Sequence, residues 1–335
     1  MKISIITTIY KAEKDLPRLL DSMMSQKSKE LEFYLIDNGS PDHCGEICSE
    51  YVKKDSRFVL VSLVENIGYI AARNYGIEHC SGDYIGFCDS DDFLEQGGYD
   101  HAVEIIKKTD CDLYMTSWNT VTGNTIKKND LPYEVGKYIG QDVNSVVLPN
   151  AYGPINGKGI LHGFAWKMIY RHSIVKINNI SFMEALKPYE DQIFNIDVIN
   201  KCNTVYVDDK VIYNYISSTT SITGQMSRKY DAFAEWGRIT ALFHEKMKRA
   251  NTIAEHIAIC NHNSYAFYSI VLNISKTKKH IKEISEILDS IIDSSMVNYT
   301  LANYNVKSLK IRFTMFCVKM RLFSFVVTIV RCLLK

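Results

Sequence analysis

The sequence lacks a long apolar run, a paired-cysteine motif and a glycine-rich phosphate loop, and each absence excludes a class of protein. Near the end of the chain the longest uncharged run, Leu322–Val330, has nine residues, whereas a helix that crosses a bilayer needs ~20. None of the nine cysteines occurs as C-x-x-C, so we expect reduced thiols that pack as small apolar side chains. Neither G-x-G-x-x-G nor G-K-[ST] follows the first predicted strand, which argues against a dinucleotide-binding or P-loop site.

Acidic residues are missing from the last part of the chain. No aspartate or glutamate follows Asp293, whereas seven basic residues do: Lys307, Lys310, Arg312, Lys319, Arg321, Arg331 and Lys335. Because the net charge of all 335 residues is only +1, the remainder is net acidic, and we expect no nucleic-acid partner. The start, Met1–Ile6, has a very short apolar run and no small-residue cleavage site, so no signal peptide is expected.

Through the first half of the chain, short apolar runs alternate with stretches of helical periodicity. The composition, 46% hydrophobic and 23% charged, is that of an ordinary globular protein. The runs predict five strands, at Ile3–Ile9, Leu31–Ile36, Phe58–Val64, Tyr84–Cys88 and Leu113–Thr116. Such alternation predicts an α/β fold with a mostly parallel, twisted sheet covered by helices on both faces. Right-handed crossovers then place every strand-to-helix turn on one edge, where ligands of such sheets bind.

Polar and acidic residues follow the predicted strands at that edge. Thr7–Tyr10 ends the first strand, Asp37 ends the second, Asn66 follows the third, and Asp89–Asp92 ends the fourth. Three carboxylates within four residues repel one another, and a shared Mg²⁺ or Mn²⁺ would relieve that repulsion. The alternative is a helix N-cap with acids in the first turn, where the helix dipole stabilises them.

Four motifs of this half share their order and approximate spacing with one known family. They are Ile6–Tyr10, Leu35–Ser40, Asn66–Gly76 and Asp89–Asp92. Together they resemble the GT-A-fold family 2 glycosyltransferases of bacterial surface-polysaccharide synthesis, which make O-antigen, capsule and lipopolysaccharide. The likeness continues less tightly, and fades beyond about residue 224, through Ala165–Arg171, Tyr189–Phe194, Tyr213–Tyr215 and Ser221–Thr223. It implies a GT-A-like sheet with helices on both faces and a nucleotide-sugar donor.

The resemblance implies a role for the residues at the strand ends. Those implied to contact the nucleotide-sugar are Thr8, Tyr10, Asp37, Asn66, Gly68, Arg73, Asp89 and Ser90. Asp37 would accept hydrogen bonds from the base, Asp89 would face the ribose, and Asp91 would hold a metal that bridges both phosphates. From the residues alone, Arg73 could instead form a structural ion pair with a strand-end acid, and Asp92 could support or cap the loop.

A second acidic pair, Glu190-Asp191, precedes a helical run and so lies at a predicted helix start. The resemblance implies that Asp191 is the base that takes the proton of the acceptor hydroxyl, which contributes ~10²–10⁴-fold. A helix N-terminus lowers the pKa of a carboxyl group, whereas Glu190 and burial raise it, and the sequence leaves the balance open. The alternative is that both acids only complement the helix dipole. A single base implies inversion, hence a β-linkage from an α-linked UDP-sugar.

The middle of the chain offers candidates for contacts to the acceptor or the diphosphate: His162, Trp166, Lys167, Glu190 and Ser221. Aromatic faces stack on sugar rings, so Trp166 could form an acceptor platform, with a plain core position as an equal alternative. Family members often carry a basic residue just after the paired tyrosines, where this sequence has Ile216. Neutralisation of the diphosphate would then fall to another basic residue among Lys167, Arg171, Arg228 and Lys229.

The motifs predict two regions. Residues 1–224 would form the catalytic domain, with a nucleotide-sugar half at 1–117 and an acceptor half at 118–224, and 225–335 a helical C-terminal region. In its tail, 307–335, basic residues alternate with apolar ones, as in helices that lie in the plane of an anionic membrane surface. This predicts a cytoplasmic protein bound peripherally to the inner face of the plasma membrane. The alternative is a final helix packed on the body or in a homodimer interface.

Together with the resemblance, these features predict an inverting glycosyltransferase with Mn²⁺ or Mg²⁺ as cofactor. It would transfer a hexose or N-acetylhexosamine from a UDP-sugar to a saccharide acceptor carried on a lipid diphosphate. A sugar-1-phosphate nucleotidylyltransferase is one alternative, although Thr7–Lys14 lacks the glycine-rich basic loop that such an enzyme needs. A catalytically silent saccharide-binding subunit is another, and the presence of both Asp91 and Asp191 argues against it.

Overall fold

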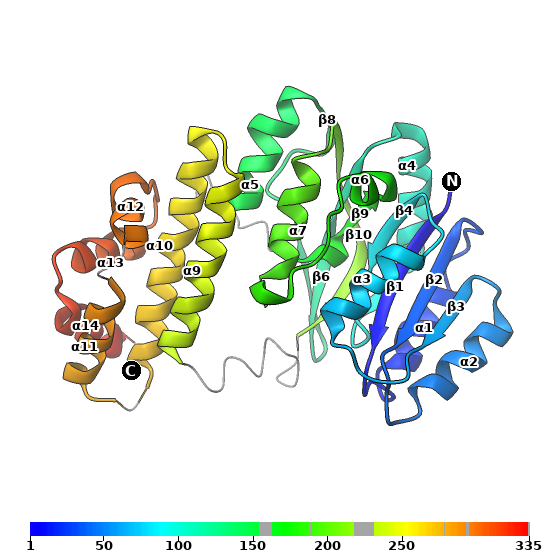
Figure 1. Cartoon of the computed structure of the whole chain (residues 1–335), viewed down its shortest axis with the longest axis horizontal. Helices are drawn as coiled ribbons and strands as arrows, with labels where there is room; N and C mark the ends of the chain where they lie inside the picture. The colour runs from blue at the N-terminus through cyan, green and yellow to red at the C-terminus, as the bar shows by residue number, and fades with distance from the viewer. Residues whose placement is uncertain (154–162, 188, 218–230, 278, 293–294, 334–335) are drawn as a thin grey trace. The chain divides into compact units, whose positions relative to one another are not determined.

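A computed structural model of the chain describes residues 1–153, 163–187, 189–217, 231–277, 279–292 and 295–333. The chain divides into two compact units (Figure 1). The first comprises Met1–Val147 and His162–Ser218, and the second comprises Leu148–Leu161 and Thr219–Lys335. The segment 148–161 therefore belongs to the second unit, although it lies inside the range 1–224 that the motifs assign to the catalytic domain.

Among the described residues of the first unit, ten strands form one sheet in the order β3-β2-β1-β4-β9-β6-β10-β5, with β7 beside β6 and β8 beside β10. Their bounds are β1 Ile3–Ile9, β2 Leu31–Asp37, β3 Phe58–Ser62, β4 Tyr84–Phe87, β5 Phe93–Leu94, β6 Leu113–Thr122, β7 Thr125–Asn129, β8 Gly136–Ile139, β9 Met168–Arg171 and β10 Thr204–Ile216. Strands β1 to β4 are parallel, as the sequence predicts. From β9 on the sheet is mixed, because β9 is antiparallel to both β4 and β6. The α/β fold class is thus confirmed, and the parallel arrangement holds for the N-terminal half.

Helices of the first unit connect the strands and cover the sheet. Their bounds are α1 Leu16–Met24, α2 Cys44–Lys54, α3 Tyr69–His79, α4 Gly98–Thr109, α6 His172–Ile177 and α7 Glu190–Ile199, with short turns η1 Val143–Val147, η2 Ala165–Lys167 and η3 Glu184–Leu186. In α1, Leu16, Leu19, Leu20 and Met23 are buried at helical spacing. Since β1 and β2 are also buried along almost their whole length, the core of this unit lies between the sheet and these helices.

The carboxyl ends of β1, β2 and β4 meet at one edge of the sheet. Ile9 is in register with Asp37, and the Cys88 N–H donates to the Ile6 carbonyl, which places Asp89 one strand away. The turn after β2 contains Gly39 with φ +65°, where a Cβ would lie 2.6 Å from the backbone of Glu65. Only glycine accepts both the angle and that approach. The close packing draws the loop after β3 to the same edge as the other strand ends.

The second unit is helical, as predicted for the C-terminal region. Its helices are α5 Leu148–Tyr152, α9 Ala232–Arg249, α10 Ile253–Ser275, α11 Ile281–Ile292, α12 Ser295–Asn303, α13 Leu309–Lys319 and α14 Phe323–Leu333. Helix α10 packs against α5, α9, α12, α13 and α14. It begins with a capping box, in which the side chains of Thr252 and Glu255 each accept the other residue's backbone N–H. None of the helices in the described part of the chain is long and apolar enough to cross a membrane.

Candidate active site

Asp92 anchors the acidic loop after β4 to the end of β10. Its buried carboxylate accepts hydrogen bonds from the Tyr213 hydroxyl and from the Ile216 backbone N–H, each at 2.7 Å. The same Tyr213 oxygen accepts the Asp89 N–H at 3.1 Å. Both oxygens of Asp92 are therefore engaged by protein donors. This geometry fits the supporting role that the sequence left open for Asp92 better than a role as a metal ligand.

Asp91 has a carboxylate with no hydrogen bond or ion pair to another side chain in the described part of the chain. Arg18 contacts its backbone carbonyl instead, at 2.6 Å. Burial and the neighbouring charge of Asp89 raise the pKa of Asp91 to about 6, and a carboxyl group in such surroundings is stabilised by a cation. The described residues hold no group of three or more His, Cys, Asp or Glu side chains that could cage a metal. A hard divalent ion fits here if diphosphate oxygens complete its coordination, as Mg²⁺ sites commonly do.

Arg73 bridges the acidic loop and the start of α7. Its Nη2 lies 2.6 Å from Asp89 Oδ1 and its Nη1 lies 2.9 Å from Asp191 Oδ1. The buried guanidinium also lies 5.4 Å from the ring centroid of Tyr69 and 5.5 Å from that of Phe182. Burial would lower the pKa of Arg73, but the two carboxylates outweigh it and raise the pKa. The structural ion pair that the sequence left open is therefore present, and it joins two acids rather than one.

Asp191 lies in the first turn of α7, as the sequence predicts. Besides Arg73, its carboxylate contacts the Ala165 backbone, whose N–H donates to Oδ2 at 3.0 Å. Burial raises the pKa of Asp191 to about 6; Arg73 opposes this shift and Glu190 adds to it. Burial and the neighbouring Glu190 therefore outweigh the effects that lower the pKa of Asp191. About 14% of the side chain stays exposed, so a hydroxyl group can still reach it.

Glu190 connects α7 to α3 and does not point into solvent. Its side chain is buried, and Oε1 accepts the Tyr69 hydroxyl proton at 2.5 Å. Burial and this acidic partner raise the pKa of Tyr69. The Arg73 guanidinium also lies over the Tyr69 ring. The hydrogen bond between Tyr69 and Glu190 therefore holds in place a side chain that contacts Arg73. The role of Glu190 in contacting an acceptor stays a prediction.

Lys167 is fully buried, which differs from the surface position that a contact to a diphosphate would need. Its Nζ has no hydrogen-bond partner among the described residues and lies 4.8 Å from the ring centroid of Trp118. Burial lowers the pKa of Lys167 to about 7, and the charge of Asp191 opposes that shift. In this conformation Lys167 is a core residue close enough to Asp191 to be affected by its charge.

Trp166 occupies the core position that was the alternative to an acceptor platform. Only 2% of the residue is exposed. Its ring stacks on Tyr213 at a centroid distance of 4.4 Å and on Phe164 at 5.0 Å, with Tyr215 at 5.9 Å. These stacked rings cover Trp166, so in this conformation it supports the Tyr213 hydroxyl and presents no open face to a sugar.

The turn after β2 and the loop after β3 are joined by a hydrogen bond from the Ile67 N–H to Asn38 Oδ1 at 3.0 Å. Asp37 is buried, and its Oδ1 accepts the Ser40 N–H at 3.0 Å. Asn66 Oδ1 accepts the N–H of Gly68, which begins α3, at 2.9 Å. Asp37 and Asn66, both expected to contact the nucleotide, thus lie at this edge, and Gly68 also serves as the N-cap of α3.

Three further expected nucleotide contacts remain accessible at this edge. Thr8 and Ser90 are half-buried. Tyr10 is exposed, with Lys11 Nζ 5.2 Å from its ring centroid. Their contacts to a nucleotide stay a prediction.

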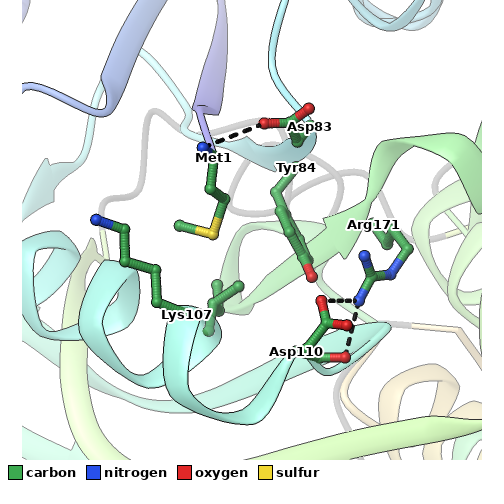
Figure 2. A pocket seen from close by; sticks show the side chains of 7 residues that line it. Met1, Asp83, Tyr84, Lys107, Asp110 and Arg171 are labelled. Atoms are coloured by element: carbon green, nitrogen blue, oxygen red, sulfur yellow. Dashed lines mark hydrogen bonds and ion pairs between the residues drawn. The ribbon is translucent and has the colours of Figure 1, made fainter.

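The remaining basic and acceptor candidates fall into two groups. His162, Ser221, Arg228 and Lys229 lie outside the described residues. Arg171 lies at the wrong edge for a diphosphate contact, because it pairs with Tyr84 at the start of β4. Figure 2 shows its guanidinium turned toward Asp110, at 2.7 Å, beside a pocket that also contains Met1, Asp83 and Lys107.

Tyr213 and Tyr69 support the site through their hydroxyl groups, and the sequence alone does not identify them as site residues. Which carboxylate each hydroxyl reaches depends on the pairing of β10 and the packing of α3, and no local pattern reveals that. The one signal in the sequence is that each tyrosine lies inside a segment that resembles the family, Asn66–Gly76 and Tyr213–Tyr215.

Residues 4–156 match the family model described as Glycosyl transferase family 2. The chain is 25% identical over 221 residues to the uncharacterized glycosyltransferase EpsJ of Bacillus subtilis, an alignment covering 66% of this chain and 62% of the relative. It is 27% identical over 216 residues to the poly(ribitol-phosphate) beta-N-acetylglucosaminyltransferase TarS of Staphylococcus aureus, covering 64% of this chain and 35% of the relative. The alignments therefore span less than two thirds of the length of these two relatives.

Solved structures share the fold of the whole chain. The crystal structure of S. aureus TarS 1-349 in complex with UDP-GlcNAc has a TM-score of 0.70, 20% sequence identity, and covers 99% of this chain and 90% of that chain. The mannosyltransferase PcManGT from Pyrobaculum calidifontis, in complex with GDP-Man and Mn²⁺, has a TM-score of 0.55, 11% identity, and covers 99% of this chain and 87% of that chain. These likenesses confirm a GT-A-like sheet followed by a helical region. The family match covers residues 4–156, and these solved structures, at 20% identity and below, show that the fold is shared.

Proposed function

We propose that the chain is a metal-dependent, inverting glycosyltransferase that moves a hexose or N-acetylhexosamine from a UDP-sugar to a saccharide acceptor. The observation that carries the proposal is the pair of carboxylates bridged by Arg73, with Asp89 after β4 and Asp191 at the start of α7. Displacement at a sugar carbon needs stabilisation of the leaving diphosphate on one side and a proton acceptor on the other. A UDP donor is supported by TarS, whose solved structures include complexes with UDP and UDP-GlcNAc.

On the donor side, Asp91 would hold a Mn²⁺ or Mg²⁺ ion together with the diphosphate oxygens. When bound, such an ion neutralises the negative charge that grows on the departing diphosphate. Asp37 would accept a hydrogen bond from the base, and Asp89 and Ser90 would face the ribose. The tie between Asp92 and Tyr213 supports this proposal because it holds the acidic loop in one conformation.

On the acceptor side, Asp191 would act as the general base. As the acceptor oxygen bonds to C1 of the sugar, the bond from C1 to the phosphate oxygen breaks and the hydroxyl proton passes to Asp191. A pKa raised to about 6 suits this task, because the group is ionised at neutral pH and binds a proton more tightly than an ordinary aspartate does. Attack opposite the diphosphate inverts C1, so an α-linked UDP-sugar would give a β-linkage.

We extend the proposal to the acceptor, a saccharide on a lipid diphosphate of bacterial surface-polymer synthesis. O-antigen, capsule and lipopolysaccharide are the polymers that the sequence motifs favour. Relatives named for glycosylation of poly(ribitol-phosphate) add that polymer to the acceptors to be tested. An acceptor of this kind places the reaction at the cytoplasmic face of the plasma membrane, to which the enzyme would bind peripherally.

The test is UDP release from a panel of UDP-sugars, with and without Mn²⁺, for wild type, Asp91→Ala and Asp191→Asn. Wild type should turn over only with the metal. Asp91→Ala should bind the donor more weakly, because the cation loses its protein ligand. Asp191→Asn should keep donor binding and lose ~10²–10⁴-fold in kcat, because the proton has no acceptor.

Asp209→Asn is the matched control, since it removes an exposed carboxylate on β10 and should leave both quantities unchanged. Full activity of Asp91→Ala in a chelator would overturn the metal assignment. Release of pyrophosphate instead of UDP would favour a nucleotidylyltransferase. Donor binding without turnover by wild type on any acceptor would favour a silent saccharide-binding subunit.

A further inference from the structure

Helix α13 of the second unit carries an apolar stripe that none of the described residues of that unit covers. Four residues at helical spacing form it, Leu309, Phe313, Phe316 and Met320, and Leu322 and Phe325 extend it through the following turn into α14. Leu309 is 78% exposed, Phe316 55%, Met320 56% and Phe325 54%. The rings of Phe313 and Phe325 lie 6.3 Å apart, so the two helices present one continuous patch. We call these six residues the aromatic face.

The aromatic face is not needed to fold the unit. On the opposite side of α13, Ile311, Met315 and Val318 are buried, and α13 packs against α10 and α14. The helix therefore has one apolar side for the core and a second one directed outward. Exposed aromatic side chains gathered in one place are uncommon on a soluble surface and mark a site of interaction.

Basic residues border the aromatic face on both sides. At 100° per residue, Lys310 lies on one flank of the stripe and Arg312 and Lys319 lie on the other. All three side chains are exposed, and none forms an ion pair with a described residue. By contrast, Arg321 pairs with Asp289 at 3.0 Å and Arg331 donates to backbone carbonyls, so both already have structural partners.

We propose that the aromatic face and its three flanking cations, Lys310, Arg312 and Lys319, dock the enzyme on a bilayer that contains anionic lipid. Large apolar side chains enter the boundary between headgroups and acyl chains, and long basic side chains beside them reach the phosphates. No helix of the described residues can span a bilayer, so α13 would lie in the plane of the surface. This narrows the docking surface from the whole predicted tail to α13, the turn after it and Phe325 at the start of α14, because Val326 and Val327 of α14 are buried.

The charges around the aromatic face favour an anionic bilayer over a second copy of the chain as its partner. Two copies joined through this face would bring like charges together, since no acid follows Asp293 and like charges oppose association. An anionic surface instead attracts each basic residue by about fivefold in partitioning. The proposal stands apart from the transfer reaction, although docking would bring the site to a lipid-linked acceptor.

The experiment is sedimentation of the full chain with vesicles of phosphatidylglycerol and phosphatidylcholine, and with phosphatidylcholine alone. Wild type should sediment with the anionic vesicles and be released by salt. The triple variant Lys310→Gln, Arg312→Gln, Lys319→Gln should partition about a hundredfold more weakly. The double variant Phe313→Gln, Phe316→Gln should lose more than about tenfold. All five positions are exposed, Phe313 least at 38%, so both variants should unfold within a few degrees of wild type.

Two matched controls remove the same chemistry elsewhere. Lys29→Gln, Lys53→Gln, Lys108→Gln takes three exposed lysines from the first unit, and Phe233→Gln takes an aromatic residue that is 55% exposed on α9. Both should sediment as wild type does. Wild type that stays in solution with anionic vesicles would overturn the proposal. So would a wild-type dimer that Phe313→Gln, Phe316→Gln dissociates in ultracentrifugation. UDP release on a water-soluble acceptor should be unchanged in all variants, which separates this test from the test of the reaction.

Discussion

At the scale of single residues, Arg73 offsets the repulsion between two neighbouring carboxylates, because it forms an ion pair with each of them. Its guanidinium contacts Asp89 and Asp191 at once and is itself buried. Without that shared cation, both acids would keep the cost of burial and lose the attraction that compensates it. Arg73 therefore sets both the distance between the donor and acceptor sides and the acidity of the proposed base.

Replacing Arg73 by lysine should move the acid limb of the pH–rate profile toward neutral pH. In wild type the pKa of Asp191 is about 6, and the base works ionised, so kcat/KM should fall tenfold per pH unit below about 6. An ammonium can contact one carboxylate but lacks the planar fork that reaches both. With less opposing charge the pKa of Asp191 rises and protonation begins at higher pH. The measurement is kcat/KM against pH for both proteins, with thermal unfolding as a check on the fold. A limb at the same pH in both would show that Arg73 does not act on the base.

The candidate site divides into residues that the sequence can nominate and contacts that it cannot. Asp91 and Asp191 could be chosen because each ends or begins an element with a recognisable motif. The partners of Arg73 could not be chosen, because one guanidinium reaches acids from β4 and α7 only once α3 is packed on the sheet. The position of Trp166 was likewise open, since an aromatic residue suits a sugar platform and a core equally well.

Lys167 is the second residue whose environment leads to a prediction. Burial brings its pKa to about 7, below its usual 10.5, and its Nζ has no hydrogen-bond partner among the described residues. The folded protein therefore binds this proton less tightly than the unfolded chain does. It follows that Lys167 lowers stability at pH 7 and below, and that this loss disappears as pH rises toward about 10.5.

Lys167→Met should raise the free energy of unfolding by roughly 1–4 kcal/mol at neutral pH, and by less near pH ~9. Urea unfolding at the two pH values measures both differences. Lys246→Met is the matched control, because Lys246 is also buried but donates to the Tyr152 carbonyl at 2.7 Å. Loss of that bond should offset the gain. A Lys167→Met protein less stable than wild type at neutral pH would mean that the ammonium has a favourable partner in the fold.

At the scale of elements, the strands that could be predicted are those that alternate with helices. Strands β1 to β4 are apolar runs of this kind, and they form the parallel part of the sheet. Strand β9 could not be predicted, because its partners β4 and β6 come much earlier in the chain. Periodicity identifies a strand but not its neighbour. The antiparallel insertion of β9 is therefore the main feature of the sheet that the sequence left undetermined.

The hydrogen bonds of the Tyr213 hydroxyl, which join β10 to the acidic loop after β4, should control the affinity for the donor. Tyr213→Phe removes the hydroxyl that joins Asp92 to the Asp89 backbone, and the ring should stay stacked on Trp166. Asp92 would lose a buried donor, at ~1–3 kcal/mol of stability. The loop that carries Asp89 and Asp91 should then be less ordered, and UDP should bind more weakly in calorimetry with Mn²⁺ present.

Tyr114→Phe is the control for Tyr213→Phe, because it should lower the stability of the protein without affecting the acidic loop. The Tyr114 hydroxyl donates to the buried carboxylate of Asp208 at 2.8 Å, and Tyr114 lies near the start of β6, away from the strand ends that carry the acids. This variant should lose similar stability and bind UDP as wild type does. Equal UDP affinity in both variants would show that the tie does not order the loop.

At the scale of the whole molecule, the two units do not follow the order of the chain. Residues 148–161 leave the first unit and join the second, and α5 packs on α10 there. The sequence indicated a change from strand–helix alternation to helices alone, which locates the second unit approximately. The sequence could not indicate that α5 belongs to the second unit, because the apolar pattern of a short helix does not identify the unit that it packs against.

This arrangement predicts how the chain tolerates truncation. A chain cut after Ser217 would keep α5 but lose α10, so Leu148 and Tyr152, which are buried in the full chain, would be exposed. It should retain the far-ultraviolet circular dichroism of the sheet, bind the dye ANS and aggregate, because a new apolar patch is uncovered. Adding Leu148→Gln and Tyr152→Gln to the truncated chain should reduce dye binding and aggregation. In the full chain the same two substitutions should destabilise the helical unit by several kcal/mol, since they remove buried apolar contacts. A truncated chain that stays monomeric without them would mean that α5 is covered by the first unit instead.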